Sequence, residues 1–211
     1  MFDLNKKNYA FTLVEVLLTL VIVGVVAAML IPTLITYINR TAFKSAYKKA
    51  YANTISAFDR VASDNGGNIK GVCQNSVEFR DLLSSYMLKV KTCDQGYSQG
   101  CRYSSATGQN GQVDSGLSWA ENSPAVVLND GTIMQFYLSA PDCSDGVHGC
   151  GFVTIDVNGM GQPNRAGEDV YMLHIKSDSI KPFGSPGDGY VNDCDTYNSM
   201  GWTCAFDRLN D

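Results

Sequence analysis

The sequence, 211 residues long, predicts an α+β protein in which one long N-terminal helix packs on a four-stranded antiparallel sheet. Three observations predict this fold class. A charge-free apolar run near the N-terminus continues into an amphipathic stretch of helical period. Four short segments typical of strands follow in the second half of the chain, separated by turn residues. A helix followed by a run of strands is the order expected of an α+β domain.

The apolar run extends from Val16 to Asn39 without a charged residue. As a helix, its 24 residues would be ~36 Å long, which exceeds the ~30 Å hydrocarbon core of a bilayer. The run therefore predicts one membrane span over about 16–39. Two alternatives fit the same residues: an ordinary secretory signal peptide cut near Ala27, and a plain anchor that does not assemble. The signal peptide accounts less well for the apolar residues that continue past Ala27.

The helix is predicted to continue to about Ser63, so that one helix covers 11–63. Its second half carries one apolar stripe, with cationic residues elsewhere on the cylinder. The stripe consists of Phe43, Tyr47, Tyr51, Ile55, Phe58 and Ala62. The cluster Asp64-Asn65-Gly66-Gly67 ends the helix, and residues 64–211 are predicted to form one globular domain.

Within this domain, a short helix is predicted from Val77 to about Leu88, with Ser76 as its N-cap. A long Gly-rich and Ser-rich loop is predicted from Cys93 to Gly116. The strands are predicted at 125–128, 132–137, 151–157 and 170–175, the first two forming a hairpin around Asp130-Gly131.

Charge is distributed unevenly along the chain. Residues 1–62 contain seven Lys or Arg and three Asp or Glu, whereas residues 63–211 contain nine and eighteen. The acidic globular part argues against nucleic-acid binding, because it has no basic stripe to contact phosphates. The basic stretch Arg40–Arg60 is expected to face lipid headgroups or the acidic surface of a neighbour.

Seven cysteines all follow the apolar run, which suits an oxidising compartment. No C-x-x-C occurs, which argues against zinc-finger, thioredoxin and haem-attachment sites. Spacing suggests three local pairs, although it does not fix the connectivity, and it leaves Cys73 either free or paired between chains. The three close pairs are Cys93 with Cys101, Cys143 with Cys150, and Cys194 with Cys204.

No arrangement of residues indicates catalysis. His148 lies in a turn-rich loop and His174 in a predicted strand, neither at a motif spacing from a nucleophile, and no G-x-S-x-G occurs. We therefore expect no catalytic residue and no enzymatic activity.

One loop has residues suited to a calcium ion. From Asp156, oxygen-bearing side chains follow two apart, with a glycine at the sixth position, as in an EF-hand loop. The twelfth position is Gly167 rather than an acid, so the candidate ligands are Asp156, Asn158 and Asp169. The alternative is that Asp156, Asn158 and Asn164 cap tight turns through their own backbone. A second acidic cluster at Asp188, Asn192, Asp193 and Asp195 is a weaker candidate.

The N-terminus has a distinctive order. A leader, residues 1–10, carries Lys6 and Lys7 and ends in the small residue Ala10; Phe11, three uncharged residues, Glu15 and the apolar run follow. This order resembles the N-terminus of type IV prepilins, a family that includes the pseudopilins of type II secretion. The predicted helix and strands are in turn similar to the pilin fold.

The resemblance implies that prepilin peptidase cuts between Ala10 and Phe11 and methylates the new amino group of Phe11. The family usually has Gly before the cut, where this chain has Ala10. Gly24 and Pro32 stand where pilin helices commonly carry Gly and Pro, and Pro32 is expected to kink the helix. The resemblance also implies a bond between Cys194 and Cys204, because pilin-like domains often close their C-terminal loop in this way.

Glu15 is a charge at the edge of the membrane span, a costly position that suggests a function. An α-amine is largely cationic at neutral pH and stays basic when methylated. In a bundle of subunits, the amine of Phe11 would pair with Glu15 of a neighbour and offset much of the desolvation cost of both charges. Since this pairing works at one axial offset, it would set the stagger of a filament.

We therefore expect a subunit of a type II secretion pseudopilus or a type IV pilus-like filament. The expected partners are other pilin-like subunits, prepilin peptidase, an inner-membrane assembly platform and membrane lipid. The expected location is the bacterial inner membrane, with the globular domain in the periplasm or, after assembly, in a filament or at the cell surface. Flanking charge alone would favour the opposite orientation, but the cysteines and the resemblance outweigh it. The alternative is a membrane-anchored, disulfide-rich binding or adhesin domain that does not polymerise and keeps its leader.

Overall fold

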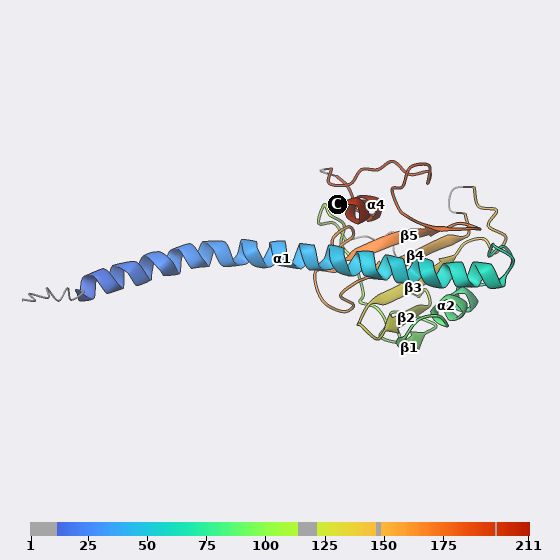
Figure 1. The fold of residues 1–211 in the computed structure, drawn as a ribbon, viewed down its shortest axis with the longest axis horizontal. Coiled ribbons are helices and arrows are strands. Elements are labelled where there is room, and N and C mark those ends of the chain that lie inside the picture. The colour runs from blue at the N-terminus through green and yellow to red at the C-terminus, as the bar shows by residue number, and fades with distance from the viewer. Residues whose placement is uncertain (1–11, 114–121, 147–148, 197) are drawn as a thin grey trace, which may run out of the picture. The chain divides into compact units, whose positions relative to one another are not determined.

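The computed structural model describes residues 12–113, 122–146, 149–196 and 198–211 (Figure 1). The chain divides into two compact units, residues 1–41 and 42–211. The leader, the residues Ala10 and Phe11 of the expected cleavage site, and His148 lie outside the described residues.

Helix α1 covers Leu13–Asp64 and is continuous through Pro32 (Figure 1). Its first part lies in the N-terminal unit and its second part, from Ala42, in the larger unit. The helix ends where Gly66 and Gly67 have positive φ values of 79° and 93°, a conformation that glycine adopts without steric cost. The helix ends at Asp64, one residue after the end predicted at about Ser63, and its predicted start at Phe11 lies outside the described residues.

In the larger unit, α1 buries one face against the sheet. Five of the residues on this face are Tyr47, Ala50, Thr54, Phe58 and Val61. The Tyr47 ring stacks on that of Tyr171 with their centroids 3.8 Å apart. The buried face is therefore rotated by a fraction of a turn from the predicted stripe. Phe43, Tyr51 and Ile55 of that stripe pack at the margin of the buried face and are only partly buried.

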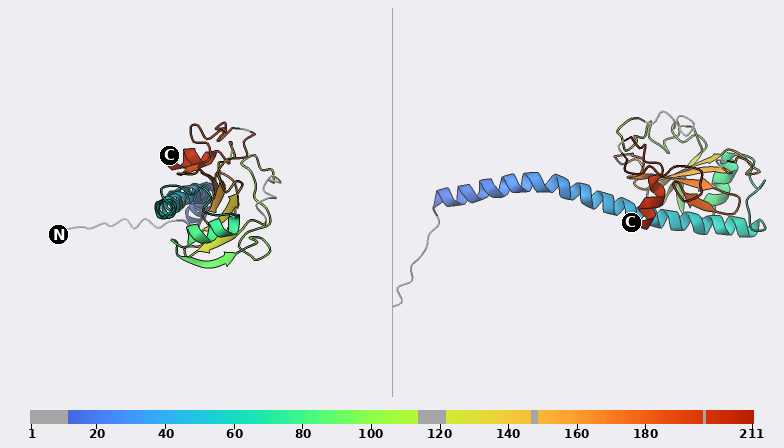
Figure 2. Two further views of the ribbon diagram at one scale, coloured as in Figure 1. Left: turned by 90° about the vertical axis from the view of Figure 1, so that its right-hand side faces the viewer. Right: turned by 90° about the horizontal axis from the view of Figure 1, so that it is seen from above.

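The sheet has six strands in the order β1-β2-β3-β4-β5-β6, and each pairs antiparallel with the next along the chain. Figure 2 shows the second half of α1 beside the sheet. Helix α2 packs on β3 and β2, and α4 packs on β5. The strands are β1 Lys89–Cys93, β2 Ala125–Leu128, β3 Ile133–Leu138, β4 Gly151–Asp156, β5 Val170–Ile175 and β6 Ile180–Pro182. The four predicted strands correspond to β2 to β5.

The prediction of four strands is wrong because it missed both edges of the sheet. In β1 every residue but Cys93 is exposed, so no apolar alternation reveals the strand. Lysines at 89 and 91 suit an edge strand, since charges there discourage pairing with other chains. Strand β6 has three residues and ends in Pro182, which an edge strand tolerates.

Two short helices complete the larger unit. Helix α2 covers Ser76–Ser84 and ends earlier than predicted, because β1 begins soon afterwards. Its N-cap is Asn75, whose side chain accepts the N–H of Glu78, whereas the hydroxyl of Ser76 accepts the N–H of Leu138. Helix α4, Cys204–Asn210, was not predicted, because its seven residues are too few to show a helical period.

Candidate functional site

The N-terminus of α1 is capped by its own side chains. Thr12 donates both its backbone N–H and its hydroxyl to Oε2 of Glu15, each over 2.8 Å, and the N–H of Glu15 donates to the Thr12 hydroxyl over 3.2 Å. This reciprocal arrangement is a capping box, which satisfies N–H groups that a helix start leaves without partners. The spacing T-x-x-E is visible in the sequence and could have predicted it.

The first part of α1 exposes its apolar side chains. Leu13, Met29 and Tyr37 are 70–77 % exposed, and no residue of its most apolar 18-residue window is buried. A Cβ at Gly24 would meet no atom within 4 Å, so nothing within the described chain requires a glycine there. The helix is long and apolar enough to cross a membrane and is a candidate membrane anchor.

Comparison with known families matches this region. The family described as the prokaryotic N-terminal methylation motif matches residues 5–31. The chain carries a prepilin-type N-terminal signal. This signal spans the end of the leader, the expected cleavage site, the capping box and Gly24. No curated protein and no solved structure matches the chain.

The prepilin-type signal occurs on type IV pilins and pseudopilins and supports a pilin-like subunit anchored in a membrane through α1. The match ends at residue 31, so Pro32 lies just beyond it. The larger unit adds the rest of a pilin-like layout, which is a helix on an antiparallel sheet with disulfides in the C-terminal region.

A second candidate site is the loop from Asp156 to Asp169, called the acidic loop below. It joins the paired ends of β4 and β5, where Asp156 lies opposite Val170. Asp156 Oδ1 accepts the N–H of Asn158 over 3.2 Å, which closes a tight turn. Asp169 accepts the N–H of Asn164 on one oxygen over 2.8 Å and that of the following residue on the other over 2.6 Å. The two carboxyl groups lie close enough for their charges to interact, and the side chain of Asn158 bonds to Asp169.

The polar groups of the acidic loop are deeply buried. Asp156 and Asn164 are each 4 % exposed and Asp169 is fully buried. Burial, and then the charge of Asp169, raise the pKa of Asp156 to about 8, and burial also raises the pKa of Asp169. The hydroxyl of Tyr103 and the side chain of Asn158 interact with these carboxyl groups and offset part of both increases.

Four buried side-chain atoms of the acidic loop have no hydrogen-bond partner among the described residues. They are the oxygens Oδ2 of Asp156, Oδ1 of Asn158 and Oδ1 of Asn164, and the nitrogen Nε of Arg165. Sequence reasoning selected Asp156, Asn158 and Asp169 as candidate ligands and assigned Asn164 only to turn capping. The structure brings the three candidate ligands together, and Asp169 also accepts the backbone N–H of Asn164.

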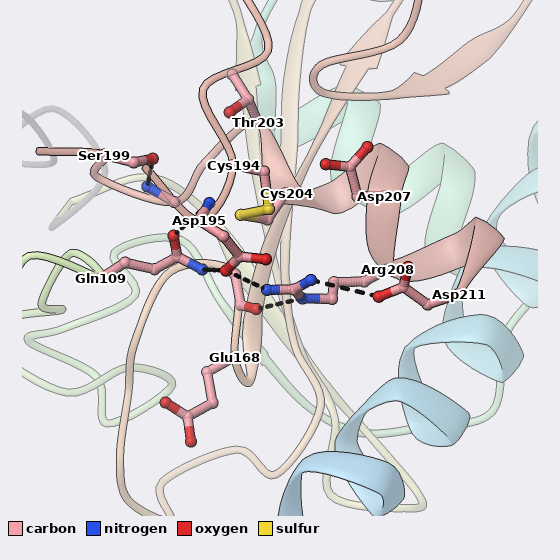
Figure 3. A network of polar contacts seen from close by, with 12 residues as sticks. Gln109, Glu168, Cys194, Asp195, Ser199, Thr203, Cys204, Asp207, Arg208 and Asp211 are labelled. Atoms are coloured by element: carbon pink, nitrogen blue, oxygen red, sulfur yellow. Dashed lines mark hydrogen bonds and ion pairs between the residues drawn. A yellow bond between two sulfur atoms is a disulfide. The ribbon is translucent and has the colours of Figure 1, made fainter. Parts of the chain in front are cut away.

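The second acidic cluster, at Asp188–Asp195, is arranged differently. Asp188 accepts the N–H groups of Gly184 and Tyr190, and Asp193 accepts the hydroxyl of Thr203. Asp195 pairs with Arg208 over 2.6 Å (Figure 3). The protein itself therefore provides partners for these acids, and the cluster is not a candidate cation site.

Three disulfides join Cys93 to Cys101, Cys143 to Cys150 and Cys194 to Cys204. Cys73 is free and buried, and burial raises the pKa of its thiol to about 11. Because the thiolate is the reactive form, this burial disfavours a bond between chains at Cys73.

Among the two histidines, His174 lies within the described residues. It is fully buried in β5, with its ring 5.0 Å from that of Phe152 and 4.7 Å from that of Phe183, centroid to centroid. These contacts are those of a core residue packed between aromatic rings.

Proposed function

We propose that the chain is a structural subunit of a type II secretion pseudopilus or a type IV pilus-like filament. It is made as a precursor, cut between Ala10 and Phe11, methylated at Phe11 and assembled through the first part of α1. The observation that carries this proposal is a prepilin-type signal on a membrane-length helix whose described part contains one charged residue before Arg40, namely Glu15.

The geometry of Glu15 supports a role between subunits. Both hydrogen bonds from Thr12 go to Oε2, and no hydrogen bond within the described residues is made to Oε1. A carboxylate oxygen accepts more than one hydrogen bond, so Glu15 can cap its own helix and still accept the amine of a neighbour's Phe11. This pairing would bring two opposite charges together in an apolar bundle, where each alone is costly.

Gly24 supports close packing in the same bundle. Its missing side chain leaves space that no part of the described chain fills, and small residues let helices approach closely in membranes. We propose that a neighbouring helix lies against this position. The exposed apolar side chains of the first part of α1 would then exchange lipid contacts for contacts with other subunits.

The globular domain is proposed to lie in the periplasm and, after assembly, on the outside of the filament. The three disulfides support this location, because they persist in oxidising compartments. Prepilin peptidase and an inner-membrane assembly platform are the proposed partners in processing and assembly. The role is mechanical, and we propose no catalytic activity.

The first experiment is mass spectrometry of the N-terminus of the protein from its native cells. The filament proposal expects a mature chain that begins with N-methylated Phe11. A chain that keeps its leader would contradict the proposal and favour an anchored binding domain that does not polymerise.

The second experiment measures entry into sheared filaments for three variants. Glu15→Ala removes both the cap and the charge, whereas Glu15→Gln keeps an oxygen that accepts the Thr12 N–H and removes only the charge. Thr12→Ala is the matched control, because it removes the hydroxyl from the cap and keeps the carboxylate. We expect both Glu15 variants to be cleaved but excluded from filaments, and Thr12→Ala to assemble. Efficient assembly of Glu15→Gln would rule out the charge pairing.

A further inference from the structure

Three exposed apolar side chains lie close together in the chain at the start of the sheet. Leu88 is 75 % exposed and Val90 is 69 % exposed, and Tyr86, just before them, is 37 % exposed. Single exposed apolar residues are ordinary, whereas neighbouring ones mark surfaces that meet another molecule. The proposed assembly through the first part of α1 gives these three residues no role.

Strand β1, which contains Val90, forms one edge of the sheet (Figure 1). One side of β1 pairs with β2, and no strand among the described residues pairs with its outer side. An edge strand presents backbone N–H and C=O groups that can pair with one more strand. The opposite edge, β6, has three residues and ends in Pro182, which has no N–H to donate. The five residues of β1 therefore make the better template.

The charge of β1 selects the partner. Lys89 and Lys91 are exposed, and their ammonium groups bond to neutral acceptors. Lys89 donates to the hydroxyl of Ser84 over 2.8 Å, and Lys91 donates to the carbonyl of Gln99 over 2.5 Å. Neither lysine forms an ion pair within the part of the chain that the structure describes. Two positive charges on an otherwise acidic unit attract an acidic segment and repel a basic one.

A groove beside the start of β1 has the same character. It is lined by Leu88, just before the strand, and by Lys49 and Arg60 of α1. Lys49 pairs with Asp130 over 2.9 Å, whereas Arg60 is exposed and has no ion pair among the described residues. A segment paired with β1 would reach this groove and meet a further positive charge beside an apolar side chain.

A second copy of the chain fits this edge poorly. Its β1 has the same lysines, and the exposed residue of its β6 is Lys181, so both edges of its sheet are basic. Acids near its C-terminus, such as Asp195 and Asp211, already pair with Arg208 and Lys44. We infer that β1 is a docking edge, to which an extended acidic segment of a different protein adds as a further strand.

The test measures the binding of fluorescent peptides at low salt to the full-length, unassembled protein in micelles of neutral detergent. The outcome therefore does not depend on polymerisation. The first peptide alternates valine and glutamate, the second alternates valine and lysine, and the third is the first with every backbone nitrogen methylated. We expect the first to bind at least about 10-fold more tightly than either of the others, because only the first has both acids and backbone N–H groups.

Hydrogen exchange adds a structural measurement. The backbone amides of 89–93 should exchange more slowly with the first peptide bound, since strand addition gives the outer side of β1 hydrogen-bond partners. Equally tight binding of the methylated peptide would overturn strand pairing. Equally tight binding of the valine–lysine peptide would overturn the choice of an acidic partner.

Matched variants locate the site. Lys91→Glu reverses an exposed charge on β1, and Lys181→Glu makes the same change on β6. Val90→Ser removes an exposed apolar side chain from β1, and Val191→Ser, at a residue that is 85 % exposed, is its control. Lys91→Glu should weaken binding of the valine–glutamate peptide about 10-fold and Val90→Ser about 5-fold, with both controls unchanged. Losses no larger in the β1 variants than in their controls would contradict the inference. Self-association of the unaltered protein that Lys91→Glu abolishes would also contradict it, by assigning β1 to a second copy.

Discussion

Two regions of the larger unit are rich in acids, and they differ in the burial and in the partners of their carboxyl groups. In the acidic loop, two buried carboxyl groups lie together, and three oxygens have no partner among the described residues. In the C-terminal segment, defined here as Asp188–Asp211, the carboxylates accept backbone N–H groups, a hydroxyl or the charged groups of Arg208 and Lys44. Acidic composition alone therefore does not indicate a cation site.

Arg208 pairs with two acids of the C-terminal segment (Figure 3). Its guanidinium contacts Asp195 over 2.6 Å and Asp211 over 3.3 Å, and its Nε donates to the carbonyl of Gly167 over 3.3 Å. Lys44 of α1 pairs with Asp211 over 2.9 Å. The acids of the segment are thus paired with its own Arg208 and with Lys44 of α1, and the contact with Gly167 joins the segment to the acidic loop. The two regions are neighbours with different means of neutralisation, which the following changes can separate.

The largest expected effect comes from the covalent bond of the C-terminal segment. Replacing both Cys194 and Cys204 by Ala should lower the free energy of unfolding by about 3 kcal/mol, because the bond closes a loop with a sequence separation of 10. Denaturant unfolding of the full chain in micelles would measure this loss. An unfolding free energy equal to that of the unaltered chain would contradict the prediction.

A smaller effect is expected when the cation of the C-terminal segment is removed. Arg208→Met keeps much of the side-chain volume but leaves Asp195 and the Gly167 carbonyl without their charged partner. The loss should be about 1 kcal/mol, since the acids that Arg208 contacts are largely exposed. Arg208→Lys should recover part of it, because one ammonium cannot reproduce a forked guanidinium. Thermal melts of the three proteins would rank them, and an equal midpoint for all three would refute the central role of Arg208.

The parts of the fold that sequence reasoning found are those with a strong apolar period. Helix α1 buries one regular face in its second half, and strands β2 to β5 are short apolar segments that are buried along most or all of their length. Strand β1 is almost wholly exposed, and β6 and α4 are too short to show a period. Strand β1 pairs with β2 across a long loop, β6 pairs with the adjacent β5, and α4 begins at the Cys194–Cys204 bond; none of these contacts produces an apolar period in the sequence.

The candidate sites show the same limit. The prepilin-type signal is a local pattern, and the sequence contains all of it. In the acidic loop, the spacing from Asp156 indicated oxygen ligands, but the sequence could not distinguish an oxygen that caps a turn from one that has no partner. That difference depends on how the loop closes between β4 and β5. For the same reason, the acids of the C-terminal segment resembled a site until their contacts with Thr203 and Arg208 were known.

The smallest expected effect is the response of the C-terminal segment to acid. The hydrogen bond from Arg208 lowers the pKa of Asp195, and that from Lys44 lowers the pKa of Asp211. A carboxyl whose pKa is lower in the folded state adds stability above its unfolded pKa, about 3.9 for Asp, and loses it as the pH falls through the folded value. Stability should therefore fall below about pH 4, and by less in Arg208→Met, where Asp195 has already lost its partner. Melting at pH 5 and pH 3 measures both losses. An equal loss in the two proteins would mean that the Asp195 pair contributes nothing to acid sensitivity, and that exposure to solvent has already screened it.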